Sequence, residues 1–418
     1  MQSVLNPQSW PFELEDLPNS ARLVGGGVRD ALLGHSSGYL DLDFVVKDSP
    51  VSIAQAIARR YQAGYVLLDA ERQIARVVFP KTTADFALQV GKSLEEDLHR
   101  RDFTINAIAY RPHDGKIMDP LNGYADLQRG TIRMISEANL RDDPLRLMRA
   151  YRQAAQLNFT LDPETQNAIR EFAPLLSQVA AERIKVELGY LLSSSAGTPW
   201  LSQLYKDGLL EHCFPNLSTE SIARLAAIDE AEGMLSRQYP DLASKLHQRL
   251  SDRAQGAEAL RRTVLSTVKL LALVALDPDT AEATLLKLKY SRNEIRLICT
   301  VIRGIQAFAQ QTSQILGSKT QQYQFFQLMG KFFPAFVVVN LAMGGCLAQL
   351  QPLIHAYGDP SSPVAHPQPL LSGYELIQAL HLSPGPNIGK LLTAIAYAQA
   401  EGQVHSKAEA IAYARRQL

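Results

Sequence analysis

Cysteine is scarce in this chain, with only three residues of this type among 418. Cys213, Cys299 and Cys346 lie far apart and without the spacing of a metal site, so they indicate reduced thiols rather than a disulfide-linked secreted domain. The nine histidines are also scattered and include no H-x-x-x-H pair. We therefore expect neither a zinc site nor a histidine-based phosphohydrolase module.

Long apolar runs are missing too, since no eighteen successive residues are apolar, as a membrane-spanning helix would require. The first residues, MQSVLNPQSWPFELEDLP, are neither basic nor followed by an apolar segment, so they lack the pattern of a secretion signal. Together with the reduced thiols, these absences predict a cytoplasmic protein that does not enter a membrane.

The chain has no net charge, because 42 Lys and Arg residues balance 42 Asp and Glu residues. Residues 1–250 nevertheless have a net charge of −5, and residues 251–418 have a net charge of +5. An acidic first part and a basic second part would suit a metal site joined to an RNA-binding region. Ordinary variation of surface residues explains so small a difference equally well.

The length of the chain and its 46% hydrophobic content allow several domains with a large core. In the first 135 residues, segments 65–69, 74–79 and 85–88 predict strands, and segment 51–61 predicts an amphipathic helix. From about residue 140, alanine- and leucine-rich segments with a helical period dominate. We predict an α/β head, a small mixed sheet with helices, followed by an all-α remainder.

The most informative stretch is LVGGGVRD at residues 23–30, followed by DLD at residues 41–43. It predicts a short buried strand, a glycine turn that lets the backbone approach an anion closely, and a helix over residues 28–33. Residues 40–46 alternate like a strand, which places Asp41 and Asp43 on one face with about 6.6 Å between their Cα atoms. Two carboxylates in this arrangement suit Mg²⁺ beside a bound triphosphate.

Each part alone has a simpler interpretation, since a glycine triplet is often a plain tight turn and a D-x-D pair is often a solvated strand face. Their joint order indicates nucleotidyl transfer instead. In this order the sequence resembles the class II tRNA nucleotidyltransferase and bacterial poly(A) polymerase family, whose head carries G-G-x-V-R-D and then D-x-D. The resemblance implies that Asp41 and Asp43 are catalytic and bind Mg²⁺, and that Gly26 and Arg29 hold the nucleotide triphosphate. Asp85, on a later predicted strand, is either a third, peripheral metal ligand or a solvated position.

A second match to the family is R-R-D-x-x-x-N-A within residues 94–110, LEEDLHRRDFTINAIAY. The resemblance implies that Arg101, Asp102 and Asn106 face the sugar and phosphates of the nucleotide. Without the resemblance, this stretch would be a helix with i,i+4 ion pairs. Residues 119–127, DPLNGYADL, resemble a third motif of the family, and we assign them a structural role as a turn before a helix.

The stretch DDPLRLMRAYR at residues 142–152 opens the predicted helical neck. Asp142 or Asp143 is expected to cap a helix with Pro144 at its first position, and one stripe of that helix carries Arg146, Arg149 and Arg152. The family's version, E/D-D-x-x-R, replaces a template base with protein side chains, and Asp142 stands where the family has Glu. The resemblance therefore implies that Asp143, Arg146 and Arg149 bind the nucleotide.

Hydrogen-bond chemistry explains how such a pair would select bases. A carboxylate accepts from an exocyclic amine, and a guanidinium donates to the adjacent ring nitrogen. Cytosine and adenine offer both groups, whereas uracil and guanine present an oxygen and an N–H there. One Asp–Arg pair would therefore accept CTP and ATP and reject UTP and GTP.

The remaining matches to the family are less specific. Residues 181–188, AERIKVEL, match a helix that follows these motifs in the family, and residues 384–392, PGPNIGKLL, resemble a turn in its tRNA-binding tail. A helix-turn-helix without a ligand is an equal alternative for the second segment. Breaks are expected at residues 158–163, 193–199 and 352–369, before a final helical segment at residues 373–418. We predict four parts: a nucleotidyltransferase head (1–138), a nucleotide-selecting neck (139–200), a helical body (201–350) and a tRNA-binding tail (351–418).

The resemblance implies a template-independent tRNA nucleotidyltransferase that adds nucleotides from CTP and ATP to the tRNA 3′ end, releases pyrophosphate, and contacts the acceptor stem and elbow. One alternative is a poly(A) polymerase of the same family, which is expected to have a basic extension that this sequence lacks. The other is an inactive head retained as an RNA-binding protein. The full set of motif residues, Asp41, Asp43, Arg101, Asp143 and Arg146, favours an active enzyme.

The number of nucleotides added depends, in this family, on a flexible loop before the L-x-x-D-L-x-R-R-D helix. Here only residues 86–92, FALQVGK, separate Asp85 from a helix predicted to begin at Ser93 or Leu94, which is too short for a mobile lever. Members that stop after C-C have such a short connection and depend on a separate A-adding enzyme, although some enzymes that add all of C-C-A share it. The resemblance favours addition of CC over addition of the full CCA.

Overall fold

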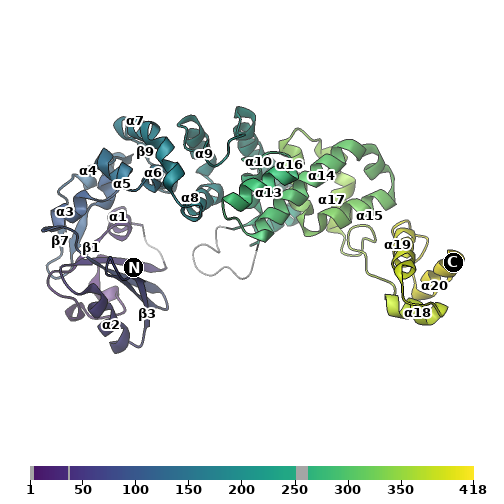
Figure 1. Ribbon diagram of the computed structural model, residues 1–418, viewed down its shortest axis with the longest axis horizontal. Coiled ribbons are helices and arrows are strands. Elements are labelled where there is room, and N and C mark those ends of the chain that lie inside the picture. Colours follow the sequence, from purple (N-terminus) through teal and green to yellow (C-terminus); the bar gives the residue numbers. More distant parts are fainter. Residues whose placement is uncertain (1–3, 36–37, 251–261) are drawn as a thin grey trace. The chain divides into compact units, whose positions relative to one another are not determined.

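The computed structural model describes residues 4–35, 38–250 and 262–418. Two compact units make up the chain: residues 1–180 with 203–212, and residues 181–202 with 213–418. Figure 1 shows that the sheet lies in the first unit and that the second unit is helical. An α/β head followed by a helical remainder is the predicted fold class, which is thereby confirmed. The four-part division is finer than these two units and stays a prediction.

A mixed sheet forms the head, with the strand order β3-β4-β5-β2-β1-β6-β7. Its strands are β1 (Arg22–Val24), β2 (Leu40–Val46), β3 (Gly64–Asp69), β4 (Ile74–Phe79), β5 (Thr82–Leu88), β6 (Ala109–Arg111) and β7 (Lys116–Met118). Strands β2 and β5 are parallel, and the remaining neighbouring pairs of this sheet are antiparallel. The bounds of β2 and β4 agree with the sequence expectation, whereas β5 begins three residues earlier than predicted.

One face of the sheet is closed by aromatic packing. Phe44 of β2 stacks on Phe86 of β5 with ring centroids 5.2 Å apart, and Trp10 packs edge-on against Phe44 at 5.3 Å. Helix α2 (Pro50–Arg60) covers the same face at β3, β4 and β5, where Tyr61 contacts Phe79. Because side chains alternate along a strand, the residues between these aromatic positions point to the other, more open face. That open face carries Asp41 and Asp43.

Short helices complete the first unit. They are α1 (Gly26–Leu32), α3 (Leu94–His99), α4 (Gly123–Arg129), α5 (Glu137–Asp142), α6 (Leu145–Leu157) and α7 (Pro163–Phe172), with a small parallel pair of strands, β8 (Thr131–Ile132) and β9 (Thr160–Leu161). Asp119 accepts hydrogen bonds from the backbone N–H groups of Gly123 and Tyr124, so the third motif is a turn that starts α4, as predicted.

The start of α6 differs slightly from the prediction. Asp142 is the last residue of α5, and Pro144 precedes the first helical residue of α6 instead of occupying that position. Pro144 is therefore the N-cap, and Asp143 contributes one hydrogen bond to the helix start, since its Oδ1 accepts from the backbone N–H of Leu145 at 3.3 Å. Helix α5 ends at Asp142, so only Asp143 and Pro144 link it to α6. The first helical residue of α6 is therefore Leu145 instead of Pro144.

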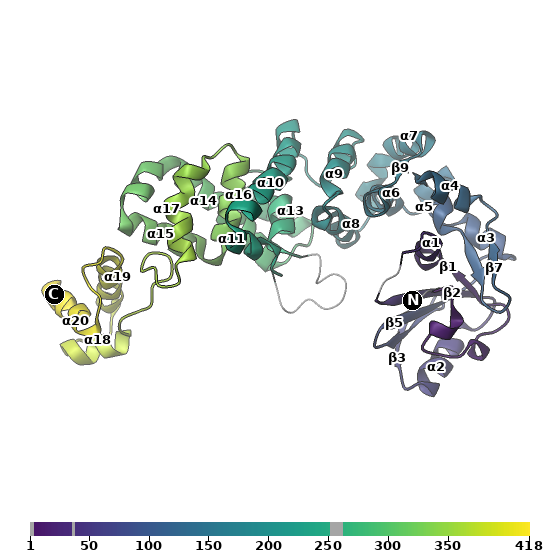
Figure 2. The same ribbon diagram turned by 180° about the vertical axis from the view of Figure 1, so that it is seen from behind.

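The second unit consists of helices. They are α8 (Ala181–Ser193), α9 (Gly197–Lys206, shared with the first unit), α10 (Thr219–Gln238), α11 (Pro240–Ser244), α12 (Val264–Leu271), α13 (Pro278–Lys287), α14 (Arg292–Gly317), α15 (Lys319–Met329), α16 (Phe333–Ala342), α17 (Leu347–Gly358), α18 (Gly373–Leu380), α19 (Pro386–Ala400) and α20 (Lys407–Arg416). Figure 2 shows α18, α19 and α20 grouped together, and Leu376, Ile388 and Ile395 form part of their small core. The predicted final helical segment is thus present.

The predicted break at residues 352–369 is partly wrong, because α17 continues to Gly358 with Pro352 inside it. Leu350, Leu353, Ile354 and Tyr357 are buried on one side of this helix. A proline inside a helix costs about 3 kcal/mol, whereas burial of one large apolar side chain contributes about 1.5–3 kcal/mol. Packing of this apolar side therefore outweighs the hydrogen bond lost at Pro352.

One stretch, Lys319–Ala342, has the length and hydropathy of a membrane span. It consists of α15, a 3-10 turn at Gly330–Phe332 and α16, and 61% of its most apolar window is buried inside the structure. Phe325 and Phe336 of this stretch contact each other with ring centroids 4.9 Å apart. The core helix of a folded protein has the same properties, so the stretch is weak evidence for a span.

Candidate active site

The glycine turn between β1 and α1 lies directly against the carboxylates. Gly25 has a φ of +79°, and a Cβ atom there would lie 3.2 Å from Oδ2 of Asp43 and 3.6 Å from Nη1 of Arg101. A Cβ atom on Gly27 would lie only 2.7 Å from the backbone oxygen of Asp41. The left-handed conformation of Gly25 and the 2.7 Å approach at Gly27 require glycine. The structure therefore brings the first motif and Arg101 of the second motif together, as the sequence implies.

Asp41 and Asp43 both point to the open face of β2, where Asp41 is exposed and Asp43 is half-buried. Burial, together with the neighbouring charges of Asp41 and Asp85, raises the pKa of Asp43 to about 7, although Arg101 and Arg76 partly offset this rise. A bound cation would reduce the electrostatic repulsion among these three carboxylates. The hard carboxylate oxygens also fit a divalent metal ion, so the residues present suit the metal that the resemblance implies.

Asp85 is held by an ion pair, and its role as a third, peripheral metal ligand stays a prediction. It lies beside Asp43 in the parallel register of β2 and β5, and Arg76 of β4 donates two hydrogen bonds to its two oxygens, at 2.6 and 2.7 Å. Its side chain is only 18% exposed, so the interpretation as a solvated position is wrong. Among the described residues, no three His, Cys, Asp or Glu side chains are grouped so that they would hold a metal ion. The carboxylates of Asp41 and Asp43 are thus available to a metal ion, whereas Arg76 binds that of Asp85.

Arg101 is a cation next to this pair, since it adjoins Gly25 on the side where Asp43 lies. It forms an ion pair with Asp97, one turn earlier, at 3.3 Å, and about a quarter of its side chain is exposed. Its Nε atom is buried without a hydrogen-bond partner. A guanidinium with unused donors beside two carboxylates and a glycine turn is suited to the phosphates of a nucleotide.

Asp102 and Asn106 are buried in a hydrogen-bond network, instead of lining an open surface. Asp102 Oδ2 accepts from Nε and Nη2 of Arg149 at 3.0 and 2.8 Å, and Asp102 Oδ1 accepts from Nδ2 of Asn106 at 2.8 Å. Burial alone would raise the pKa of Asp102, but Arg149 and Asn106 lower it to about 2. Arg29 joins the network, since its Nη1 donates to Oδ1 of Asn106 at 2.8 Å. Direct contact of these four side chains with a nucleotide stays a prediction.

Gln153 completes this network, and the motifs did not identify it. It is buried on α6, and its Oε1 accepts from Nδ2 of Asn106 at 2.9 Å and from Nη1 of Arg29 at 3.3 Å. A signal was present, because Gln153 follows Arg149 by four residues and so lies on the same side of the helix. Gln153 and Arg149 connect the neck helix to both head motifs.

The predicted base-selecting pair lies at the start of the same helix. Arg146 donates from Nη1 to the backbone oxygen of Asn139 at 3.0 Å. Asn139 in turn donates from Nδ2 to the backbone oxygens of His99 at 2.6 Å and Arg101 at 2.8 Å. Asn139, which no motif identified, thus ties Arg146 to the segment that carries Arg101.

The connection between β5 and α3 is short and well held. It comprises Gln89–Ser93, and its backbone N–H groups at Gln89, Val90 and Lys92 donate to Val46, Asp97 and Glu96 respectively, at 2.8 to 2.9 Å. Ser93 caps α3 by accepting from the N–H of Glu96. The helix begins where the sequence predicts, and β5 ends at Leu88 as predicted, so five residues connect the two elements.

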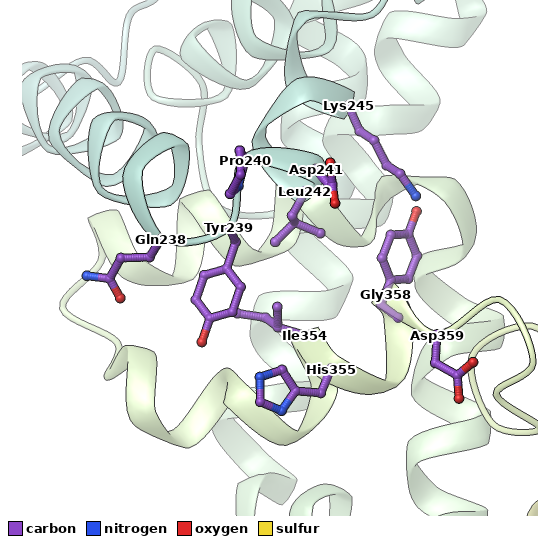
Figure 3. A pocket seen from close by; sticks show the side chains of 11 residues that line it. Gln238, Tyr239, Pro240, Asp241, Leu242, Lys245, Ile354, His355, Gly358 and Asp359 are labelled. Atoms are coloured by element: carbon purple, nitrogen blue, oxygen red, sulfur yellow. The ribbon is translucent and has the colours of Figure 1, made fainter.

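A separate cavity of about 570 Å³ lies in the second unit, between the end of α10, α11 and the end of α17. Figure 3 shows Tyr239 and His355 side by side in it, with Lys245, Asp241 and Asp359 at its edge. The ammonium of Lys245 lies 4.5 Å from the ring centroid of Tyr357. This mixture of one cation and two carboxylates selects no particular class of ligand.

Comparison with known protein families assigns most of the chain. The poly(A) polymerase head domain matches residues 21–133, and the model described as "Probable RNA and SrmB- binding site of polymerase A" matches residues 158–220. A tRNA nucleotidyltransferase domain 2 matches residues 263–414. The first match contains the glycine turn, both carboxylates and the second motif.

Individual relatives cover nearly the whole chain. A CC-adding tRNA nucleotidyltransferase of Synechocystis sp. is 46% identical over 98% of this chain and 96% of its own. An A-adding tRNA nucleotidyltransferase of Deinococcus radiodurans is 33% identical over 96% of each chain. A solved structure of a CCA-adding enzyme with ATP superposes with a TM-score of 0.72 over 95% of this chain and 91% of its own, at 20% identity, and so shares the fold. The active-site geometry and these matches lead to one conclusion: this chain is a nucleotidyltransferase and belongs to the tRNA nucleotidyltransferase and poly(A) polymerase family.

Proposed function

We propose that this protein adds two cytidines from CTP to the 3′ end of tRNA that lacks its C-C-A terminus, and releases pyrophosphate at each step. The observation that carries the proposal is the short connection Gln89–Ser93, whose backbone is held by Val46, Asp97 and Glu96. A segment of five residues held in this way is unsuited to act as a mobile lever that resizes a base site from cytosine to adenine. The 46% identity to a CC-adding relative supports the same proposal.

The two carboxylates of β2 would hold the catalytic metal ion, which we propose to be Mg²⁺. When bound, such an ion lowers the pKa of an attacking hydroxyl and stabilises negative charge on a phosphoryl group. Arg101 and the backbone at Gly26 are best placed to receive the triphosphate. Gly25 lies close to both Asp43 and Arg101, and Gly26 follows it in the same turn. Arg29 is engaged with Asp30 and Asn106, so its proposed contribution is to hold the second motif in place as well as to attract phosphate.

Base choice is proposed to lie with Asp143 and Arg146. Their hydrogen-bonding groups match cytosine and adenine equally, so this pair explains the rejection of UTP and GTP but not a stop after two cytidines. The stop is therefore assigned to the fixed size of the base site, which the short connection cannot change. Arg149, ion-paired with Asp102, is proposed to keep α6, which carries Arg146 and directly follows Asp143 and Pro144, against the head.

Incubation of the purified protein with tRNA that ends at the discriminator base, with CTP, ATP or both, tests the proposal. We expect a product that stops after two cytidines, even with ATP present. Addition of a third residue, adenosine, would identify a CCA-adding enzyme, and addition of adenosine only to tRNA ending in C-C would identify an A-adding enzyme. A long adenosine tail would identify a poly(A) polymerase, and tRNA binding without incorporation would identify an inactive RNA-binding protein.

The partners follow from this reaction. We propose that the tail, residues 351–418 with the turn before α19, binds the tRNA elbow, while the acceptor stem reaches the head. The resemblance of residues 384–392 to a turn in the family's tRNA-binding tail supports this division, whereas the basic charge of the second part of the chain lies in residues 251–350. We further propose that the protein acts in the cytoplasm and passes its product to a separate A-adding enzyme.

A further inference from the structure

Strand β5 places a different side chain beside each carboxylate of β2. In the parallel register of these strands, Asp41 lies opposite Thr83 and Asp43 lies opposite Asp85. On the other side of β5, Arg76 of β4 lies opposite Asp85. Across the strands of the open face, Asp41 is therefore next to the hydroxyl of Thr83. Asp43 is next to the ion pair that Asp85 forms with Arg76.

The hydroxyl of Thr83 contacts Asp41 directly. Its Oγ1 donates a hydrogen bond to Oδ1 of Asp41 at 2.7 Å, and Thr83 itself is only 9% exposed. A β-branched side chain on a strand has restricted rotation about χ1, so the oxygen of this hydroxyl is held in place beside Asp41. Asp41, in contrast, is exposed and would be able to rotate without that bond. The bond leaves Oδ2 and a second lone pair of Oδ1 available to another ligand.

We infer that Thr83 is a positioning residue for the proposed reaction, and that its hydroxyl holds the Asp41 carboxylate in the orientation that binds the metal ion. This inference depends on the metal site proposed above. Arg76 engages both oxygens of Asp85, so Asp85 is not placed to replace Asp41 if that carboxylate turns away. Asp41 and Asp43 are the two proposed protein ligands of the metal ion. If Asp41 turns away from the metal ion, half of these ligands are lost. Loss of such an outer partner typically weakens metal binding by about 10- to 100-fold.

Three variants test this role. Thr83→Val keeps the shape and the β-branch but removes the hydroxyl, and Thr83→Ser restores the hydroxyl. Thr82→Val is the matched control, because Thr82 is also buried on β5 but, by strand alternation, points to the opposite face. The first readout is the affinity for Mn²⁺ alone, measured by electron paramagnetic resonance without nucleotide or tRNA. Asp43→Asn identifies the part of this binding that belongs to the site.

The second readout is the Mg²⁺ concentration that gives half-maximal CMP incorporation, at saturating CTP and tRNA. We expect Thr83→Val to weaken Mn²⁺ binding and to raise the Mg²⁺ requirement, each by about 10- to 100-fold. Thr83→Ser should recover most of both, and Thr82→Val should match the parent protein. Thermal unfolding of each variant establishes that the head is folded.

A folded Thr83→Val protein with unchanged Mn²⁺ affinity and Mg²⁺ requirement would overturn the inference. The same holds if Thr83→Ser is as impaired as Thr83→Val, because the hydroxyl would then not be the cause. The Mn²⁺ measurement involves no nucleotide, so it decides the role of Thr83 even if the protein adds adenosine, or three nucleotides, and the proposed CC specificity fails.

Discussion

Asn106 of the head donates a hydrogen bond from Nδ2 to Oε1 of Gln153 on the neck helix α6, across 2.9 Å. The same helix carries Arg146 on its first turn, Asp143 lies two residues before the helix, and Asn106 also contacts Asp102 and Arg29. The proposed base-selecting residues and the head motifs are therefore parts of one hydrogen-bonded arrangement. A change at one end of this arrangement should be measurable at the other.

Replacement of Gln153 by Ala should destabilise the first unit and slow CMP addition. The change leaves one N–H of Asn106 and one N–H of Arg29 without an acceptor, which typically costs about 1–3 kcal/mol. Urea unfolding and kcat/KM for CTP provide the two measurements. Gln156→Ala is the control, because Gln156 is exposed on the same helix and its Oε1 accepts a hydrogen bond from Nη1 of Arg152 at 2.9 Å. Equal stability of the two variants would contradict the proposed role of Gln153.

Replacement of Asp41 or Asp43 by Asn should abolish incorporation while tRNA affinity changes by less than about twofold. Each change removes a metal ligand but leaves the shape of the site and the RNA-binding surface intact. Single-turnover incorporation and a filter-binding assay with tRNA measure the two effects. Asp48→Asn, an exposed carboxylate just after β2, should behave like the parent protein. More than a few per cent of the parental rate in either variant would refute the metal assignment.

Replacement of Asp143 or Arg146 by Ala should reduce correct addition and increase misincorporation of U or G. Each variant loses one half of the hydrogen-bond pattern that distinguishes cytosine from uracil, worth about 1–3 kcal/mol, or roughly 5- to 150-fold in discrimination. Competition assays with pairs of labelled NTPs measure this ratio. Arg152→Ala, three positions after Arg149, is the control. A slower enzyme with unchanged base preference would show that the two residues serve only to cap and dock α6.

Acid should destabilise the first unit through Asp102. Its pKa is about 2 in the folded protein against an ordinary value of 3.8. Because the folded pKa is lowered, the ionised form contributes its full stability above about pH 4, and this contribution is lost as the pH falls toward 2. A difference of nearly two pKa units corresponds to about 2 kcal/mol.

Comparison of Asp102→Asn with the parent protein isolates this effect. The variant should be less stable at pH 6, because Arg149 loses its charged partner, and its free energy of unfolding should fall less between pH 5 and pH 3. Urea unfolding at the three pH values measures both differences. Parallel pH profiles of the two proteins would show that the pKa of Asp102 is not lowered by folding.

Local sequence patterns were sufficient for the elements that depend on near neighbours. The alternation of LDLDFVV predicts β2 with its observed bounds, and the order of glycines, Arg29 and carboxylates predicts the strand, turn and helix around the site. Ser93 before a first turn with three acidic residues predicts the start of α3. These features depend on backbone conformation and hydrogen bonds within a few residues, which a single stretch of sequence contains.

Only the tertiary structure decided which side chains meet. Asp85 and Arg76 become partners because β4 and β5 pair in one register, and Thr83 meets Asp41 because β5 lies beside β2, forty-two residues away in sequence. Gln153 reaches Asn106 because α6 packs on the head, and Pro352 stays within α17 because that helix buries an apolar side. The sequence by itself determined the head fold, the paired carboxylates and the family. Strand order and helix docking decided the partners of those carboxylates. Both depend on packing between segments that are distant in sequence, and neither periodicity nor motif spacing contains that information.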